Sequence, residues 1–319
     1  MESEQTPQAG QCPAPWYLTV VCMFQNEAAY LEEWLAFCLS EGVEHVLLYD
    51  NASTDISRDV LQPWIETGFV ELIDWPIKFE SGAQIKAYND ALERIRGRTR
   101  WAAFIDVDEY LFSPSGRSLP ETLEQYEAHA GIIVNWQCYG SSGHVTQPIG
   151  LTIENYTRRA KANWARNRRV KTIVDPSRAT EAQSVHLFKV QEGASLVTEN
   201  FRAIQVVRST RGRMWLRHAA SWLPYLPFEP YGLTESSIRE VSVENLRINH
   251  YVTRSQAESV SKYKDRKTMR ARDRRSYTRY HDRNEVDDPI LVSRGEQVRA
   301  IIARVRAGKP ASTEAATGP

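Results

Sequence analysis

Three carboxylates interrupt an apolar run in residues 101–112, WAAFIDVDEYLF. In an extended segment Asp106 and Asp108 would share one face, with Val107 pointing back into the core. Two adjacent carboxylates raise each other's pKa unless a cation neutralises them. A divalent cation suits such a pair, and substrate phosphates would complete its coordination shell. Glu109 would point away from the shared face and support the site rather than bind the ion. The alternative is an ordinary strand end with solvated acids.

Strands and helices alternate along the part of the chain that contains these carboxylates. Continuous apolar, β-branched runs predict buried strands at YLTVVCM, HVLLY and WAAFI, and FVELI predicts a shorter one. Helical periodicity predicts helices between Asn26 and Gly42, from Asp55 toward Trp64, and from Gly82 to Ile95. Asn26 is the expected N-cap of the first helix. This rhythm predicts an α/β fold with a mostly parallel sheet flanked by helices.

A polar cluster follows each of three predicted strands: Asn26-Glu27, residues 50–55 and residues 106–109. In a parallel sheet these clusters gather at one edge, beyond the carboxyl ends of the strands, where ligands bind. Taken singly, each cluster is more simply a helix cap or a turn. Three clusters at corresponding positions indicate a ligand site.

Later segments add basic and titratable groups. A Gly/Ser loop, residues 140–144, follows the strand GIIVNWQCY and ends at His144. Residues 158–171 contain seven basic side chains, which form either a solvated face or a phosphate-binding segment. The strand-like run LRINHY carries His250 near its end.

The formal net charge is zero, but it is divided unevenly. Residues 1–157 hold 8 Lys and Arg against 23 Asp and Glu, a balance of −15, and the remainder holds 32 against 17, a balance of +15. The acidic half could hold a metal ion. The basic half could neutralise a diphosphate, nucleic acid or a membrane surface.

The cysteines and the hydropathy pattern bear on cellular location. Four scattered cysteines without CxxC spacing predict reduced thiols rather than a zinc site or disulfides. The first fifteen residues lack the pattern of a secretory signal. No run approaches the roughly 18 apolar residues of a membrane-spanning helix. We therefore expect a cytoplasmic protein. The basic helix predicted in residues 255–283 leaves open a peripheral contact with the inner face of the membrane.

Seven segments in this order resemble a group of glycosyltransferases related to families 2 and 92: FQNEAAYLEEWLAF, YDNASTD, AYNDAL, FIDVDEY, NWQCYGSSGH, VKTIV and RINHYVTRS. The resemblance covers residues 16–267 and implies a GT-A type nucleotide-sugar-binding fold. It divides the chain into a flexible tail (1–15), a GT-A domain (16–252), a basic, mainly helical extension (253–306) and a disordered tail (307–319).

The resemblance also implies roles for individual residues. Asp106 would lie near the ribose of a nucleoside-diphosphate sugar, and Asp108 would coordinate Mn²⁺ or Mg²⁺ on the diphosphate. His250 would complete the metal shell together with these aspartates. The remaining candidates would bind the donor. Loops for the base and ribose would contain Asn26, Glu27, Asp50 and Asn51, and a helix that lines the same pocket would contain Gln84 and Asn89. The candidates for the diphosphate are Lys171 and Arg169.

The expected reaction moves a sugar to a hydroxyl acceptor on a glycan, polysaccharide or lipid. A metal ion and basic side chains would stabilise the charge that develops on the leaving diphosphate. A base must take the acceptor's proton, and the candidates are His144 and Glu154, with Asp175 and His186 as further options. In similar enzymes the displacement commonly inverts the anomeric centre, which we adopt as an expectation.

Two other function classes compete with this prediction. A nucleotidyltransferase also uses paired carboxylates, but FQNEAAY lacks the glycines of a phosphate loop. A nucleic-acid-binding protein could use the basic second half and its aromatic residues. The acidic first half would repel a long polyanion, so nucleic acid is the less favoured partner.

Overall fold

A nine-stranded sheet organises the protein. The computed structural model describes residues 14–206, 232–233, 238, 240–262 and 278–310. Most of the predicted flexible tail and of the predicted basic helix in 255–283 lies outside the described residues, as does the end of the predicted disordered tail. The strands of the sheet are β1 (Trp16–Phe24), β2 (His45–Asp50), β3 (Val70–Asp74), β4 (Thr99–Phe104), β5 (Glu109–Phe112), β6 (Gly131–Cys138), β8 (Val170–Val174), β11 (Leu196–Thr198) and β14 (Arg247–His250).

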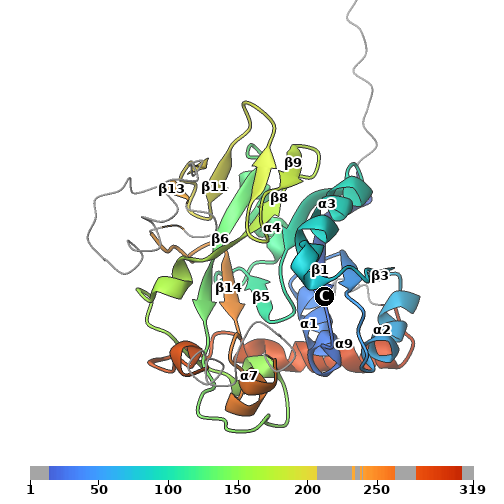
Figure 1. The fold of residues 1–319 in the computed structure, drawn as a ribbon, viewed down its shortest axis with the longest axis vertical. Coiled ribbons are helices and arrows are strands. Elements are labelled where there is room, and N and C mark those ends of the chain that lie inside the picture. Colours follow the sequence, from blue (N-terminus) through green and yellow to red (C-terminus); the bar gives the residue numbers. More distant parts are fainter. Residues whose placement is uncertain (1–13, 207–231, 234–237, 239, 263–277, 311–319) are drawn as a thin grey trace, which may run out of the picture.

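The strand order is β3-β2-β1-β4-β8-β6-β14-β5, with β11 paired to β6 (Figure 1). The first four strands are parallel, which is the arrangement that alternating strands and helices predict. β8 is antiparallel to both of its neighbours, β4 and β6. β14 is parallel to β6 and antiparallel to β5. The predicted α/β class with a mostly parallel sheet is therefore confirmed.

The helices cover both faces of the parallel half of the sheet. α1 (Ala28–Ser40), α2 (Ser57–Glu66) and α9 (Gly295–Arg306) lie on one face, and α3 (Ala83–Ile95) lies on the other. The remaining described helices are α4 (Leu119–Leu123), α5 (Thr152–Asn155) and α7 (Gln256–Lys262). Leu18, Val20 and Cys22 of β1 belong to a core shared with α1, α2 and α9. Val21 belongs to a second core shared with α3. β1 is therefore buried on both faces, as its continuous apolar run predicts.

Shorter elements complete the fold. The antiparallel pairs β9 (Ala179–Ala182) with β10 (Phe188–Val190) and β7 (Arg158–Arg159) with β15 (Val286–Asp287) lie outside the main sheet, as does the parallel pair β12 (Gln205–Val206) with β13 (Gly232–Leu233). Single 3₁₀ turns are η1 (Phe79–Ser81), η2 (Glu124–Tyr126), η3 (Ala165–Arg168) and η5 (Val292–Arg294). In the described ranges, no helix is long and apolar enough to cross a lipid bilayer.

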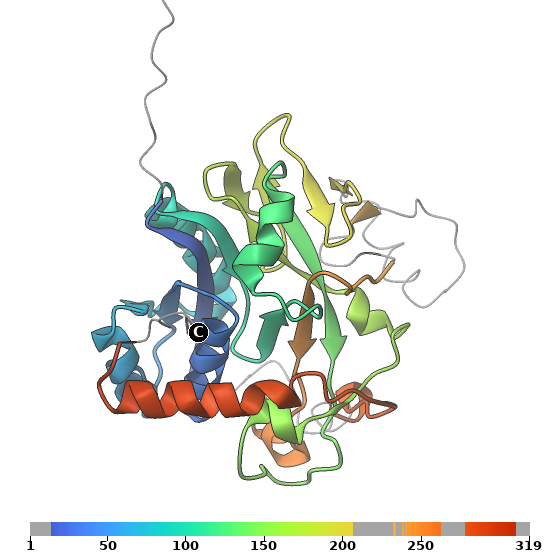
Figure 2. The ribbon, with the colours of Figure 1, turned by 180° about the vertical axis from the view of Figure 1, so that it is seen from behind.

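The last helix, α9, packs against α1 and α2 and completes the core on that side of the sheet. Figure 2 shows α9 in red, running across the base of the molecule beside the blue segments of α1 and α2. Val298, Ile301 and Val305 recur at helical spacing and are buried against the α1 side of the core. Arg306 pairs with Glu32 of α1 at 2.5 Å. The end of the predicted extension thus shares its core with the predicted catalytic domain.

We predict that Ile301→Ala lowers the free energy of unfolding by about 2–5 kcal/mol, because the buried side chain leaves a cavity between α9 and α1. Urea-induced unfolding followed by circular dichroism would measure this loss. Ile302→Ala, at the adjacent and only partly buried position, is the matched control and should cost less. Equal effects of the two substitutions would contradict the packing of α9 described above.

Candidate active site

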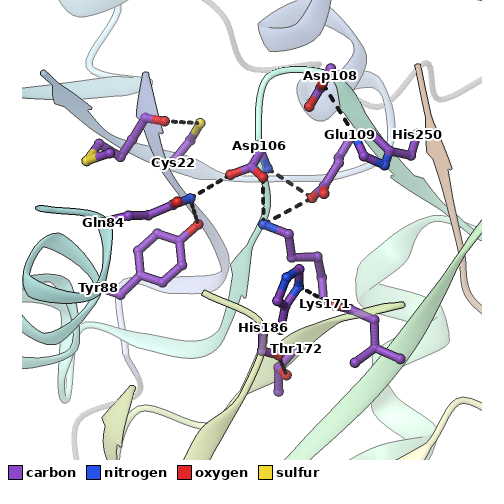
Figure 3. Close-up of polar contacts among 12 residues, drawn as sticks. Cys22, Gln84, Tyr88, Asp106, Asp108, Glu109, Lys171, Thr172, His186 and His250 are labelled. Carbon is purple, nitrogen blue, oxygen red and sulfur yellow. Dashed lines mark hydrogen bonds and ion pairs between the residues drawn. The ribbon is translucent and has the colours of Figure 1, made fainter. Parts of the chain in front are cut away.

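The two aspartates of FIDVDEY lie in a turn between β4 and β5, not in an extended strand. The backbone N–H of Glu109 donates to the carbonyl of Asp106 at 2.9 Å, which closes this turn. The prediction that Asp106 and Asp108 share one face of a strand is therefore wrong. Figure 3 shows that different partners contact the two carboxylates.

Asp106 is held by a buried lysine. Lys171 of β8 is 1% exposed, and its Nζ lies 2.8 Å from Oδ2 of Asp106. Gln84 of α3 donates to Oδ1 of Asp106 at 2.8 Å and also contacts the hydroxyl of Tyr88 at 2.9 Å. Burial raises the pKa of Asp106, but the charge and the hydrogen bond of Lys171 act together with His250 and keep that pKa below its usual value. Asp106 is therefore an ionised carboxylate.

Glu109 turns toward Asp106 and is fully buried. Its Oε2 accepts a hydrogen bond of 3.0 Å from the backbone N–H of Asp106 and lies 3.5 Å from Nζ of Lys171. Burial raises the pKa of Glu109 well above its usual value, and the nearby negative charge of Asp106 adds to the rise. The prediction that Glu109 points away from the aspartates is wrong, because the turn reverses the chain. Its contact with the backbone of Asp106 suits the predicted supporting role.

Asp108 contacts His250 and Lys262, which lie far along the chain. Oδ2 of Asp108 lies 3.4 Å from Nε2 of His250, and Lys262 of α7 donates a short hydrogen bond to the same oxygen. β14 pairs with β5 so that His250 lies opposite Glu109, which brings the imidazole to the aspartate turn. Burial raises the pKa of Asp108, but Lys262 and then His250 outweigh burial and hold that pKa well below its usual value.

The loop after β1 is joined to the loop after β2. Oδ1 of Asn26 accepts from the backbone N–H of Thr54 at 2.7 Å, and Asn26 has a φ of 57°. The N-cap of α1 is Glu27, not Asn26 as predicted. Asp55 accepts a hydrogen bond of 3.0 Å from the N–H of Ala28 and so satisfies a backbone donor in the first turn of α1.

Asp50 and Asn51, at the end of β2, are buried and bonded within the protein. Asp50 forms an ion pair of 2.7 Å with Arg58. The amide of Asn51 donates to the carbonyls of Trp75 and Ile77 at 2.7 Å each, which fastens the segment after β3. Both residues lie at the predicted edge of the sheet, and their contacts shape its loops.

Two cations near Asp108 were not singled out from the sequence. Lys262 lies in the basic run that was predicted only as an exposed helix. Arg254 follows β14 and is 5% exposed, with Nη1 3.2 Å from Oε2 of Glu27 and its guanidinium carbon 3.2 Å from the centre of the Tyr30 ring. Among the described residues, Nε and Nη2 of Arg254 have no hydrogen-bond partner. Only tertiary contacts distinguish these two residues from other basic residues.

Some predicted residues are bonded elsewhere. Asn89 binds the carbonyl of Ile85 and the backbone N–H of Ala182 and so joins α3 to β9. Glu154 forms an ion pair with Arg299 of α9 at 2.7 Å. His144 lies 3.2 Å from the carbonyl of Asn155 and packs against Tyr156, with ring centres 5.6 Å apart. The base candidates His144 and Glu154 thus remain predictions, and the contacts described for them do not include Asp106 or Asp108.

The two weaker base candidates also have structural partners. Asp175 forms ion pairs with Arg100 at 2.9 Å and Arg178 at 2.8 Å. Nδ1 of His186 lies 2.9 Å from the carbonyl of Val170, and burial lowers the pKa of His186. His186 is therefore a neutral imidazole at pH 7.

A cavity of about 190 Å³ lies beside His250, and we call it the basic cavity. Its lining comprises Trp136, Cys138, Arg166, Arg169, His250, Val252 and His281. The ring centres of Trp136 and His250 are 4.2 Å apart. Arg169, which was predicted to hold the diphosphate, lies in this lining.

A divalent cation fits part of the predicted ligand set. Oδ2 of Asp108 and Nε2 of His250 lie 3.4 Å apart, which is close enough for both atoms to contact one ion. Nδ1 of His250, the other ring nitrogen, is a buried atom without a hydrogen-bond partner among the described residues. Asp106 is already engaged by Lys171, and Lys262 would have to leave Asp108. The described ranges contain no group of three or more His, Cys, Asp or Glu side chains arranged for a metal. The residues therefore fit an ion held by Asp108, His250 and substrate oxygens.

We predict that Lys171→Met lowers the free energy of unfolding by about 3 kcal/mol or more, because it removes the buried counter-ion that Asp106 and the fully buried Glu109 share. Chemical denaturation would measure the loss. Adding Asp106→Asn should recover part of it. Lys189→Met, which breaks the exposed ion pair with Glu181, is the control and should cost under about 1 kcal/mol. A stable Lys171→Met protein would contradict the role of this lysine.

Comparison with known proteins identifies relatives of part of the chain. A glycosyltransferase family 92 protein of Ricinus communis is 28% identical over 211 residues, which is 63% of this chain and 36% of that protein. Galactan beta-1,4-galactosyltransferase GALS1 of Arabidopsis thaliana is 29% identical over 110 residues, which is 32% of this chain and 22% of that protein. The chain therefore spans about a third or less of the length of these curated relatives.

Solved structures show a weaker likeness. S. aureus TarS 1-349 in complex with UDP-GlcNAc has a TM-score of 0.36 and 15% identity, with 50% of this chain and 46% of that chain covered. Glucosyl-3-phosphoglycerate synthase from Mycobacterium tuberculosis has a TM-score of 0.26 and 18% identity, with 37% of this chain and 43% of that chain covered.

The family model of glycosyltransferase family 92 matches residues 18–283. This range includes the seven segments that carry the resemblance predicted from the sequence, and it includes the aspartate turn, Lys171, His250 and Lys262. The predicted family is confirmed. The chain belongs to glycosyltransferase family 92.

Proposed function

We propose that this protein transfers a sugar from a nucleoside-diphosphate sugar to a hydroxyl group of a glycan, polysaccharide or lipid-linked acceptor. The observation that carries the proposal is the meeting of Asp108, His250 and Lys262 at the carboxyl edge of the sheet. This edge is where open α/β sheets bind ligands. The joined loops after β1 and β2 lie at the same edge and offer a place for the nucleotide.

Charge at this edge suits a diphosphate leaving group. Asp108 and His250 would hold Mn²⁺ or Mg²⁺, which, when bound, stabilises the negative charge that develops on the diphosphate. Lys262 and Arg254 are cations in the same region, so they can share that charge once the donor is present. Lys171 keeps Asp106 ionised and fixed, which leaves Asp106 as an acceptor of hydrogen bonds from the sugar or ribose.

Relatives of this chain suggest which donor to test first. Proteins named as galactan beta-1,4-galactosyltransferases are 29–30% identical to about a third of this chain. We therefore propose a hexose donor and begin with UDP-galactose. A single inverting displacement, with a carboxylate or histidine as the base, completes the proposal. A cytoplasmic location with peripheral membrane contact also remains a proposal.

We predict that Mn²⁺ strengthens the binding of UDP to the wild-type protein and that Asp108→Asn abolishes this gain. The amide side chain cannot neutralise a divalent ion as a carboxylate does, so transfer from UDP-galactose should fall by about 100-fold or more. Thermal shift of the protein with UDP, with and without Mn²⁺, measures the first effect, because a ligand of the native state raises the melting temperature.

Asp59→Asn is the matched control, since Asp59 is an exposed carboxylate in the first turn of α2. It should leave both UDP binding and its metal dependence unchanged. The proposed role of Asp108 fails if Mn²⁺ strengthens UDP binding equally in Asp108→Asn and the wild-type protein.

A further inference from the structure

The basic cavity lies outside the loops proposed for the nucleotide. Its walls come from β6, from the segment that leads into β8, and from β14. The nucleotide loops follow β1 and β2 in the parallel half of the sheet. His250 belongs to both places, because it lies 3.4 Å from Asp108 and also lines the cavity. The cavity therefore adjoins the reacting centre from the side opposite the nucleotide, where an acceptor would approach.

The lining of the cavity has a one-sided charge. Among the described residues it contains two arginines and two histidines, and neither Asp nor Glu. A planar guanidinium binds a carboxylate or phosphate with two parallel hydrogen bonds, and two guanidiniums on one wall favour an anion over a neutral hydroxyl. Of the seven basic residues between 158 and 171, Arg166 and Arg169 line this cavity.

The dimensions and the apolar wall indicate a single sugar unit. A volume of about 190 Å³ is smaller than the roughly 300–1,000 Å³ of pockets that hold drug-sized ligands. Trp136 supplies an aromatic surface against which the C–H face of a sugar ring can pack, and Val252 and Cys138 add apolar contacts. One ring with one charged substituent matches both the space and the charge.

We propose that the basic cavity binds an anionic group, a carboxylate or a phosphate, on the acceptor sugar, and that Arg166 and Arg169 select acceptors that carry it. This inference rests on the proposed glycosyltransferase function and adds the acceptor class to it. It assigns Arg169 to the acceptor, whereas the sequence predicted a contact with the donor's diphosphate. Trp136 orients the ring so that its hydroxyl faces the centre beside His250.

The test uses three probes of equal ring size: methyl galacturonide, galactose 6-phosphate and methyl galactoside. Binding of each probe to the full chain saturated with UDP and Mn²⁺ is measured by ligand-observed NMR titration. The variants are Arg166→Gln, Arg169→Gln and Arg169→Lys. The control is Arg168→Gln, because Arg168 is an exposed residue of the same segment that is not part of the cavity lining.

We expect at least one anionic probe to bind the wild-type protein about tenfold or more tightly than methyl galactoside, as charge-assisted contacts imply. Each glutamine variant should remove most of this preference. Arg169→Lys should keep part of it, because the charge remains, and Arg168→Gln should keep all of it. Comparing galacturonide with galactose 6-phosphate tells which anion the cavity takes. Unchanged melting temperatures of the variants show that the fold is intact.

Three outcomes would overturn the inference. The first is equal binding of anionic and neutral probes to the wild-type protein. The second is a preference that survives in the Arg166→Gln, Arg169→Gln double variant. The third is displacement of the anionic probe by UDP together with weaker UDP binding in both glutamine variants, which would assign the cavity to the donor's diphosphate. The Mn²⁺-dependent gain in UDP binding, which Asp108→Asn should abolish, is measured without any acceptor probe, so failure of the acceptor class and failure of the proposed function are distinguishable.

Discussion

The ion pair between Lys171 and Asp106 is the interaction on which the candidate site depends. Lys171 is almost fully buried on β8, and its ammonium lies between the carboxylates of Asp106 and Glu109. Removing such charges from water is costly, and only mutual compensation makes it tolerable. The pair therefore fixes the turn between β4 and β5 to β8. The position of Asp108, and with it the approach of His250, depends on that turn.

The position of β8 in the sheet brings together charges from the acidic and the basic halves of the chain. β8 inserts antiparallel between β4 and β6 and joins the parallel half of the sheet to the half that contains β6 and β14. The carboxylates come from the acidic first half of the chain, and Lys171, His250 and Lys262 come from the basic second half. A chain with zero net charge thus concentrates opposite charges at one edge of its sheet.

Sequence reasoning located the elements well where a pattern is local. The apolar runs and the helical periodicity gave β1 to β4 and α1 to α3 close to their observed bounds. It failed at the aspartate turn, because a period of two assumes an extended backbone and the chain reverses after Phe104. It also misassigned the N-cap of α1, since Asp55, from a different loop, satisfies the N–H of Ala28.

The sequence by itself determined the family, the α/β class and the segments that carry the site, because hydropathy periods and motif order are properties of neighbouring residues. Only the tertiary structure decided which carboxylate meets which cation. Lys262 and Arg254 look like any other basic residues in the sequence, and Asn89 and Glu154 look like candidates for chemistry. Their partners come from segments up to 227 residues away, and electrostatic compensation acts through space, so no local pattern records it.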